Sequence, residues 1–114
     1  MVKVIATLQA RPDTVEETRA AVTSLVEPTR EEQGCVAYQL FQSNEDPTEF
    51  VTVEEFTDDA AVDAHMETEH VQAALAAAPD ILGAAPQIRR YSLAADHGIS
   101  SESITEIPQV MRLG

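Results

Sequence analysis

Two histidines, His65 and His70, lie five positions apart in the stretch "DAHMETEHV". Imidazole can act as a general base near neutral pH, and it is also a common metal ligand. If residues 57–78 form one continuous helix, five residues correspond to about 500° of rotation, so the two rings point about 140° apart. Zinc pairs on a helix normally sit four residues apart. This geometry predicts no shared metal site, and instead one histidine in an interior cavity and one at its margin.

His65 is the candidate for the cavity, because it lies beside the apolar stripe that Val62 and Met66 form on the expected helix. Glu54 is the second candidate, because it lies inside an expected strand over residues 49–56. A buried carboxylate is costly unless it is paired, and His65 or an arginine could be its partner. Each residue also has a structural alternative: His65 could serve packing only, and Glu54 could face solvent.

Aromatic residues are few, and they could form either core or a pocket. The simplest interpretation is core; the functional one is that some of them line an apolar pocket for a flat aromatic substrate. The residues are Tyr38, Phe41, Phe50, Phe56 and Tyr91.

Cys35 is the only cysteine, which excludes an internal disulfide and a thiolate zinc cluster. It is expected to be a small buried residue in a strand. Arg89 and Arg90 are expected on opposite faces of a strand, one of them in an ion pair.

The charge balance excludes several classes of partner. The chain has 20 acidic residues against 7 Lys and Arg, a net charge of −13. Nucleic acids and anionic membranes are bound by basic faces, so neither is an expected partner. The acidic surface is either an adaptation to high salt or that of an ordinary acidic cytosolic protein. No signal peptide, membrane span or glycine-rich phosphate loop is recognisable, so a cytoplasmic protein without a nucleotide or flavin cofactor is expected.

Hydrophobic periodicity predicts the elements that hold these residues. Strands are expected over residues 2–10, 35–43, 49–56 and 87–96, and helices over about 13–33 and 57–78. Asp13 or Thr14 can cap the first helix, Pro28 should kink it or begin a second short helix, and Gly34 should end it. In the second strand, strict alternation places Cys35 on the face opposite Tyr38.

The order strand, helix, strand, strand, helix, strand predicts an α+β fold of the ferredoxin-like βαββαβ type. One domain is expected over residues 1–96, followed by a tail over residues 97–114. The expected strands are apolar on both faces, and two helices can cover only one. A homodimer with its sheets packed face to face is therefore expected, with the apolar tail packed on the partner subunit.

The middle of the chain resembles the antibiotic biosynthesis monooxygenase (ABM) domain family, which includes quinol monooxygenases. The matching features are Gly34, Cys35, Tyr38, Asp46-Pro47, Phe50, Glu54, Phe56, His65 and His70. The resemblance implies a dimeric α+β barrel with His65 in the active-site pocket. It also implies that Glu54, and not Glu55, matches the glutamate that the family carries in this strand. Haem-degrading relatives typically use a pocket tryptophan, and this chain has none.

We therefore expect a cofactor-independent monooxygenase that oxidises a hydroquinone-like or polyphenolic small molecule with O₂. In this hypothesis His65 is the base and Glu54 an orienting or proton-relay group. The expected substrate-binding residues are Tyr38, Phe50, Phe56, Val62 and Met66. Two alternatives stay open, a non-catalytic dimeric protein that binds small molecules or serves a stress response, and an isomerase-type enzyme on the same scaffold.

Overall fold

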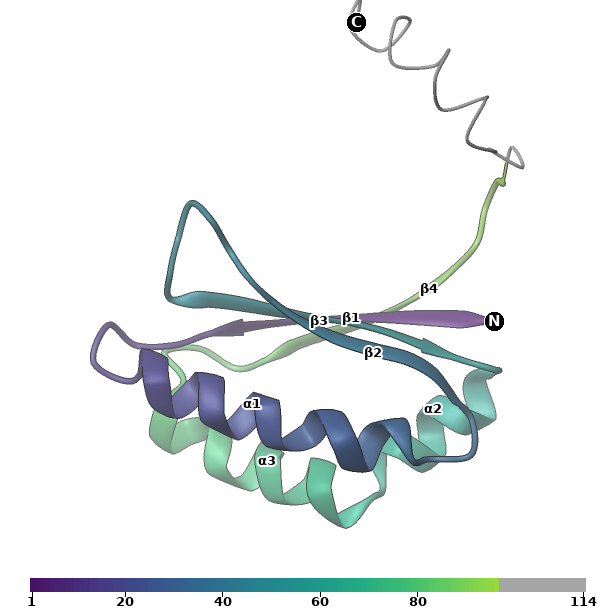
Figure 1. Cartoon of the computed structure of the whole chain (residues 1–114), viewed down its shortest axis with the longest axis horizontal. Coiled ribbons are helices and arrows are strands. Elements are labelled where there is room, and N and C mark those ends of the chain that lie inside the picture. Colours follow the sequence, from purple (N-terminus) through teal and green to yellow (C-terminus); the bar gives the residue numbers. More distant parts are fainter. Residues whose placement is uncertain (97–114) are drawn as a thin grey trace, which may run out of the picture.

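The computed structural model describes residues 1–96, in which a layer of helices covers one face of a four-stranded sheet (Figure 1). The elements follow the chain in this order: β1 (Val2–Gln9), α1 (Val15–Arg30), β2 (Cys35–Gln42), β3 (Glu49–Phe56), α2 (Asp59–Met66), α3 (Glu69–Ile81) and β4 (Gln87–Ser92). The expected α+β order is confirmed, with the second helical segment divided in two. The tail over residues 97–114, predicted to pack on a partner subunit, lies outside the described residues.

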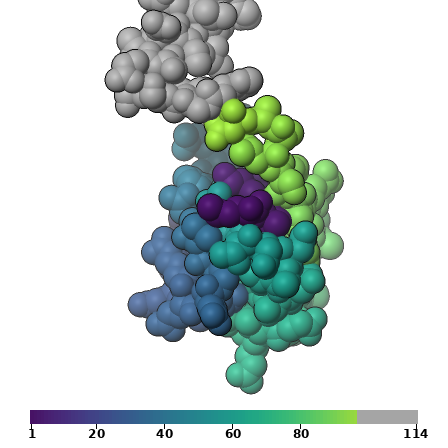
Figure 2. Space-filling view, turned by 90° about the vertical axis from the view of Figure 1, so that its right-hand side faces the viewer, coloured from purple at the N-terminus to yellow at the C-terminus, as the bar shows by residue number. Residues whose placement is uncertain are grey.

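The sheet has the strand order β2-β3-β1-β4, and every neighbouring pair of strands is antiparallel. This is the ferredoxin-like arrangement expected from the element order. Seen from the right of Figure 1, the N-terminal end of β1 lies above α2 and beside β4 (Figure 2). Within residues 1–96, no helix is both long enough and apolar enough to cross a membrane.

Alternation along β1 and β3 sends every second side chain toward the helices. On β1 these are Val2, Val4 and Ala6, and on β3 the buried set runs from Phe50 through Thr52 and Glu54 to Phe56. Burying each phenylalanine stabilises the fold by roughly 1.5–3 kcal/mol. Glu54 lies in the same buried row, where a carboxyl group is costly unless it finds a partner.

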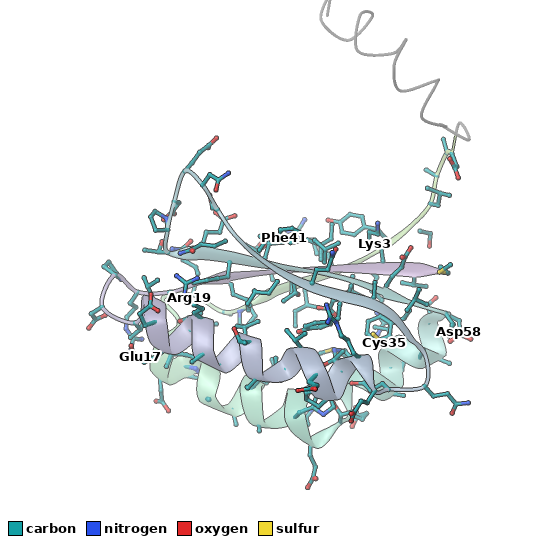
Figure 3. The ribbon with its side chains drawn as sticks, viewed as in Figure 1. Lys3, Glu17, Arg19, Cys35, Phe41 and Asp58 are labelled. Carbon is teal, nitrogen blue, oxygen red and sulfur yellow. The ribbon has the colours of Figure 1, made fainter. Side chains whose placement is uncertain are left out.

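A β-bulge near the start of β2 changes which side chains face the helices. Cys35 pairs with Phe56 while Ala37 pairs with Glu55, so Val36 is an extra residue without a partner on β3. Cys35 therefore turns to the helix-covered side and packs against the core around Phe56, whereas Phe41 points to the open side (Figure 3). The expectation that Cys35 lies opposite Tyr38 is wrong, because it assumed alternation without a bulge.

Helix α1 begins after Thr14, one of the two expected caps, and continues through Pro28 to Arg30, so no second short helix begins at the proline. The expectation that Gly34 ends this helix is wrong, since Glu31 already caps it. Gly34 instead allows a close approach between the α1–β2 loop and α2. A Cβ atom at Gly34 would overlap the Cβ atom of Ala61.

The second helical segment breaks after Met66, which contradicts the single helix expected over residues 57–78. Thr68 caps α3, because its Oγ1 accepts a hydrogen bond from the Val71 backbone N–H at 3.4 Å, and it also donates to the His65 carbonyl oxygen at 2.7 Å. A threonine followed by Glu69 is a favourable helix start. The break places His65 at the end of α2 and His70 in the first turn of α3.

Candidate active site

A cavity of about 80 Å³ lies between the sheet and the helices. Its wall is mainly aliphatic, and the polar groups that line it are Thr18, Tyr38, Thr52, Glu54 and His65. A mostly apolar cavity with a few converging polar groups is the usual form of a small-molecule site. The cavity brings His65 and Glu54 together, as expected from the sequence.

His65 is held in the last turn of α2 by contacts on several sides. Its ring lies 4.9 Å from the ring of Phe56, centroid to centroid, and its residue is buried to 4% exposure. The helix that carries it is anchored at its start, where the Asp58 side chain accepts a hydrogen bond from the Ala61 backbone N–H at 2.8 Å. Arg90 of β4 then pairs with two aspartates of α2, at 3.1 Å and 2.7 Å, which confirms the expected arginine ion pair.

The two ring nitrogens of His65 face different carboxylates. Nδ1 lies 2.9 Å and 3.0 Å from the two oxygens of Glu32, and Nε2 lies 3.5 Å from Glu54 Oε1. In a hydrogen bond to a carboxylate oxygen, which accepts, Nδ1 is the donor and carries the proton. In neutral imidazole the other nitrogen is then an acceptor. His65 Nε2, next to the cavity, is therefore the nitrogen that can take a proton.

Glu54 is the most buried carboxylate of the site. Burial raises its pKa, and a 2.6 Å hydrogen bond from Thr52 and the nearby His65 act in the opposite direction. Its second oxygen, Oε1, has no hydrogen-bond partner among the described residues. Burial, followed by the charge of Glu54, also raises the pKa of Tyr38, so this phenol remains a neutral hydrogen-bond donor. Of the two partners left open for Glu54, the structure places His65 beside it, with Nε2 3.5 Å from Oε1, and no arginine pairs with it among the described residues.

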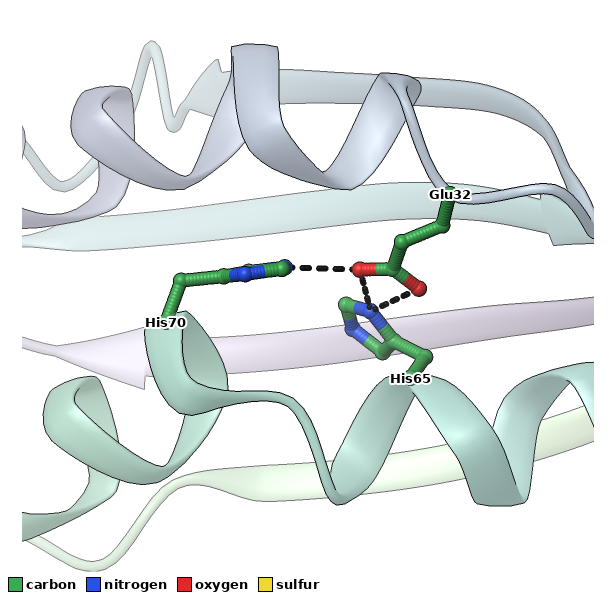
Figure 4. Close-up of side chains that lie close together, drawn as sticks. All are labelled: Glu32, His65 and His70. Carbon is green, nitrogen blue, oxygen red and sulfur yellow. Dashed lines mark hydrogen bonds and ion pairs between the residues drawn. The ribbon is translucent and has the colours of Figure 1, made fainter.

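Glu32 is the residue that the sequence did not reveal. It lies in the loop after α1, 33 positions from His65, and its carboxylate also contacts His70 Nε2 at 2.6 Å (Figure 4). The expectation that His70 points away from His65 is wrong, because it assumed one continuous helix, whereas α2 ends at Met66 and α3 begins at Glu69. Their ring centroids are 6.2 Å apart. The helix-start signal at Thr68 and Glu69 could have revealed the break, but no spacing in the sequence points to Glu32.

Cys35 lies close to this cluster and is not an activated nucleophile. Burial raises the pKa of its thiol, and the neighbouring charges of Glu32 and Glu54 act in the same direction. A thiol with a raised pKa carries little thiolate at neutral pH. Its packing against the core agrees with the structural role expected for it.

The five expected substrate-binding residues occupy three kinds of position. Tyr38 and Met66 line the cavity. Phe56 and Val62 are part of the hydrophobic core around His65 and do not line the cavity. Phe50 is also absent from the wall, and its ring lies 5.3 Å from the guanidinium carbon of Arg19.

Comparison with known proteins identifies relatives along most of the chain. Residues 1–77 match the family model described as antibiotic biosynthesis monooxygenase. The protein YcnE of Bacillus subtilis is 32% identical over 93 residues, which cover 82% of this chain and 98% of YcnE. An uncharacterized protein of Synechocystis is 29% identical over 87 residues, 76% of this chain, and the match spans 59% of its length.

Solved structures agree with the sequence relatives. A crystal structure titled antibiotic biosynthesis monooxygenase superposes with a TM-score of 0.77 at 33% identity and covers 83% of this chain and all (100%) of its own. Rv0793 of Mycobacterium tuberculosis superposes with a TM-score of 0.79 at 28% identity over 84% of this chain and 97% of its own. These relatives support a general monooxygenase role. The chain belongs to the antibiotic biosynthesis monooxygenase family.

Proposed function

We propose that the protein is a cofactor-independent monooxygenase that oxidises a hydroquinone-like or polyphenolic small molecule with O₂. One observation carries the proposal: His65, on the wall of a mostly apolar cavity, has its Nδ1 fixed by Glu32 and its Nε2 facing Glu54, which also lines the cavity. A carboxylate that fixes one nitrogen of a histidine leaves the other nitrogen placed to abstract a proton. The family match supports oxygen chemistry at this site.

The proposed reaction begins when His65 Nε2 removes a phenolic proton from the substrate. The resulting anion is electron-rich enough to reduce O₂ directly. One oxygen atom forms a bond with a ring carbon and the other leaves as water, and the substrate supplies all of the electrons. For a hydroquinone, QH₂ and O₂ thus give a hydroxyquinone and water. The protein must hold the substrate away from bulk water and stabilise the developing charge.

Glu54 and Tyr38 have the properties needed for the other proton movements. Burial favours the protonated form of Glu54, so it can donate a proton to the departing oxygen. Tyr38 remains neutral and lies on the cavity wall, so its hydroxyl can donate a hydrogen bond to a substrate oxygen. Met66 is partly exposed, and its flexible side chain is the part of the wall that yields when a ring enters.

A second candidate is a non-catalytic small-molecule-binding protein of the same fold. The specific observation in its favour is that carboxylates face both ring nitrogens of His65, an arrangement that also suits a histidine used only for packing. Such a protein would bind flat phenols without turnover.

The experiment that separates the two candidates is turnover on a panel of hydroquinones and anthrones, followed by O₂ consumption. With ¹⁸O₂, the product should gain one labelled oxygen atom.

Replacing His65→Ala should lower the rate by about 10²–10⁴-fold, as is typical for a lost general base. Glu31→Gln, an exposed neighbour of Glu32, should keep the wild-type rate. Equal rates for wild type and His65→Ala would remove His65 from the mechanism. Turnover that disappears with a chelator would contradict cofactor independence.

A further inference from the structure

We infer that Glu32, His65 and His70 form a binding site for a divalent transition-metal ion. The three side chains come from three segments, the loop after α1, the end of α2 and the start of α3 (Figure 4). Each offers one donor atom, and these atoms all lie within 4.8 Å of one another. This inference goes beyond the proposed function, because it concerns binding of an ion and not the oxidation of a substrate.

The size of the cluster fits coordination. A zinc ion bound at about 2.0–2.2 Å from each ligand holds any two ligands no more than about 4.4 Å apart. The donor atoms all lie within 4.8 Å of one another, and a tetrahedral ion would set neighbouring donors about 3.3–3.6 Å apart. The contacts of Glu32 with His70 at 2.6 Å and with His65 at 2.9 Å would therefore open by about 0.4–1 Å to admit the ion. All three side chains are mostly shielded from water, with exposures of 5% for His65, 15% for Glu32 and 24% for His70.

The chemistry of the donors selects the class of ion. Two imidazole nitrogens and one carboxylate oxygen suit zinc, iron, cobalt, nickel or copper, whereas magnesium and calcium prefer sites made of oxygen alone. Among the salt bridges of residues 1–96, no arginine or lysine pairs with Glu32 or Glu54. The chain's net charge of −13 also favours the approach of a cation.

Glu54 supplies a second, independent observation. Its side chain is 5% exposed, and within residues 1–96 its Oε1 has no hydrogen-bond partner, although it lies 3.5 Å from His65 Nε2. A histidine that binds metal through one nitrogen normally donates the N–H of the other nitrogen to a carboxylate or carbonyl. Coordination through His65 Nδ1 would place the proton on Nε2, where the unsatisfied Oε1 of Glu54 can accept it.

Metal binding and base catalysis would therefore exclude each other. Coordination uses Nδ1 and leaves Nε2 with a proton, whereas the proposed base needs Nε2 free of one. An ion at this site should inhibit proton abstraction, and the site then serves as an inhibitory or storage site for the ion. Binding is measured directly, so the result does not depend on whether a substrate for the enzyme is found.

The test is titration of the tag-free, metal-depleted full chain with Zn²⁺ in competition with a chromophoric chelator. One ion per chain is expected, and Co²⁺ should give the visible absorption of a site with nitrogen ligands. Loss of an outer carboxylate typically weakens metal binding by about 10–100-fold, which is the effect expected of Glu54→Gln. Removing a ligand through Glu32→Gln or His70→Gln should weaken it by more than about 100-fold, beyond that outer-carboxylate range.

Two variants serve as matched controls. Glu31→Gln removes an exposed carboxylate next to Glu32, and His97→Gln removes the third histidine of the chain, which lies outside the described residues. Both should bind Zn²⁺ within about twofold of wild type. His70 is partly exposed, so His70→Gln should fold, and a circular dichroism melt verifies this. The inference is overturned if wild type takes up no more Zn²⁺ than the Glu32→Gln variant, or if His97→Gln alone removes binding.

Discussion

His65 and its two carboxylates carry the chemical argument at the scale of single residues. Glu54 could be expected from the sequence, because a carboxylate at an inward position of a strand must find a partner, and its separation from His65 Nε2 is 3.5 Å. Glu32 could not be expected, because a loop places it, and loop conformation leaves no period in the sequence. The orientation of His65 therefore depends on the contact that only the structure reveals.

We predict that Glu32→Gln lowers kcat on any hydroquinone that the enzyme oxidises. The amide can offer its NH₂ group to His65 Nδ1, which favours the tautomer with the proton on Nε2. By analogy with carboxylate-to-amide changes in other histidine-dependent sites, the loss should reach about 10²–10⁴-fold, with little change in KM. Steady-state kinetics in chelator, which removes any effect of bound metal, provide the measurement. The neighbouring Glu31→Gln variant is the control. Equal losses in kcat and in folded fraction would show that Glu32 is structural only.

Local interruptions decide the site at the scale of the elements. The alternation of β1 and β3 was predictable because a strand has a fixed period of two, and the burial of Phe50, Glu54 and Phe56 agrees with it. The bulge at Val36 interrupts the period of a strand. The break between α2 and α3, where Thr68 donates a hydrogen bond to the His65 carbonyl oxygen, interrupts the period of a helix. They turn Cys35 inward and bring the two histidines together, so regular periodicity alone misplaces these side chains.

We predict that Gly34→Ala destabilises the protein by about 1–3 kcal/mol, the usual cost of overpacking. The added methyl group would overlap the Cβ atom of Ala61 and push the loop that carries Glu32 away from α2. Gly83→Ala is the matched control, since its added Cβ would meet the Arg11 Cγ atom at an ordinary 3.5 Å. Urea unfolding followed by circular dichroism gives both free energies.

A double-mutant cycle separates overlap from other effects of the alanine. Ala61→Gly removes the atom that the new methyl group meets. Gly34→Ala should therefore cost much less in the Ala61→Gly background than in wild type, a coupling of about 1 kcal/mol or more. The same cost in both backgrounds would show that the close approach of Gly34 to α2 does not limit this position.

The whole molecule has two faces of different character. The helices cover one face of the sheet, and the open face has an apolar centre of Ile5, Val51 and Val53 between the polar ends of its strands. On the neighbouring strands, Phe41 pairs with Val51 and Tyr91 pairs with Lys3, and these two aromatic residues are about half exposed, at 50% and 46%. Arg89 pairs with Ile5. An apolar patch of this kind on a sheet is typical of an interface, and a second copy of the sheet is the simplest partner.

We predict that the protein is a homodimer with its open sheet faces together. Phe41→Glu should convert it to a monomer, because the change places a charge in the apolar interface without a partner. Light scattering coupled to size exclusion measures the mass. Ser24→Glu, which adds the same charge on the exposed side of α1, should leave the dimer intact. A monomeric wild type, or a Phe41→Glu variant that stays dimeric, contradicts this arrangement.

The last prediction concerns the charge of the whole chain. With 20 acidic and 7 basic residues, repulsion within the folded state should lower stability at low salt, and the predicted dimer would bring two such charges of −13 together. The melting temperature should therefore rise with KCl and level off near 1 M, where the Debye length is about 3 Å.

A variant that neutralises three exposed glutamates (Glu27→Gln, Glu45→Gln and Glu67→Gln) should melt higher at low salt and respond less to KCl. This comparison distinguishes charge screening from a general effect of salt, because a general effect would change the melting temperatures of both proteins equally. A melting temperature that stays constant or falls with KCl, or an equal slope for the two proteins, means that surface repulsion does not set the stability.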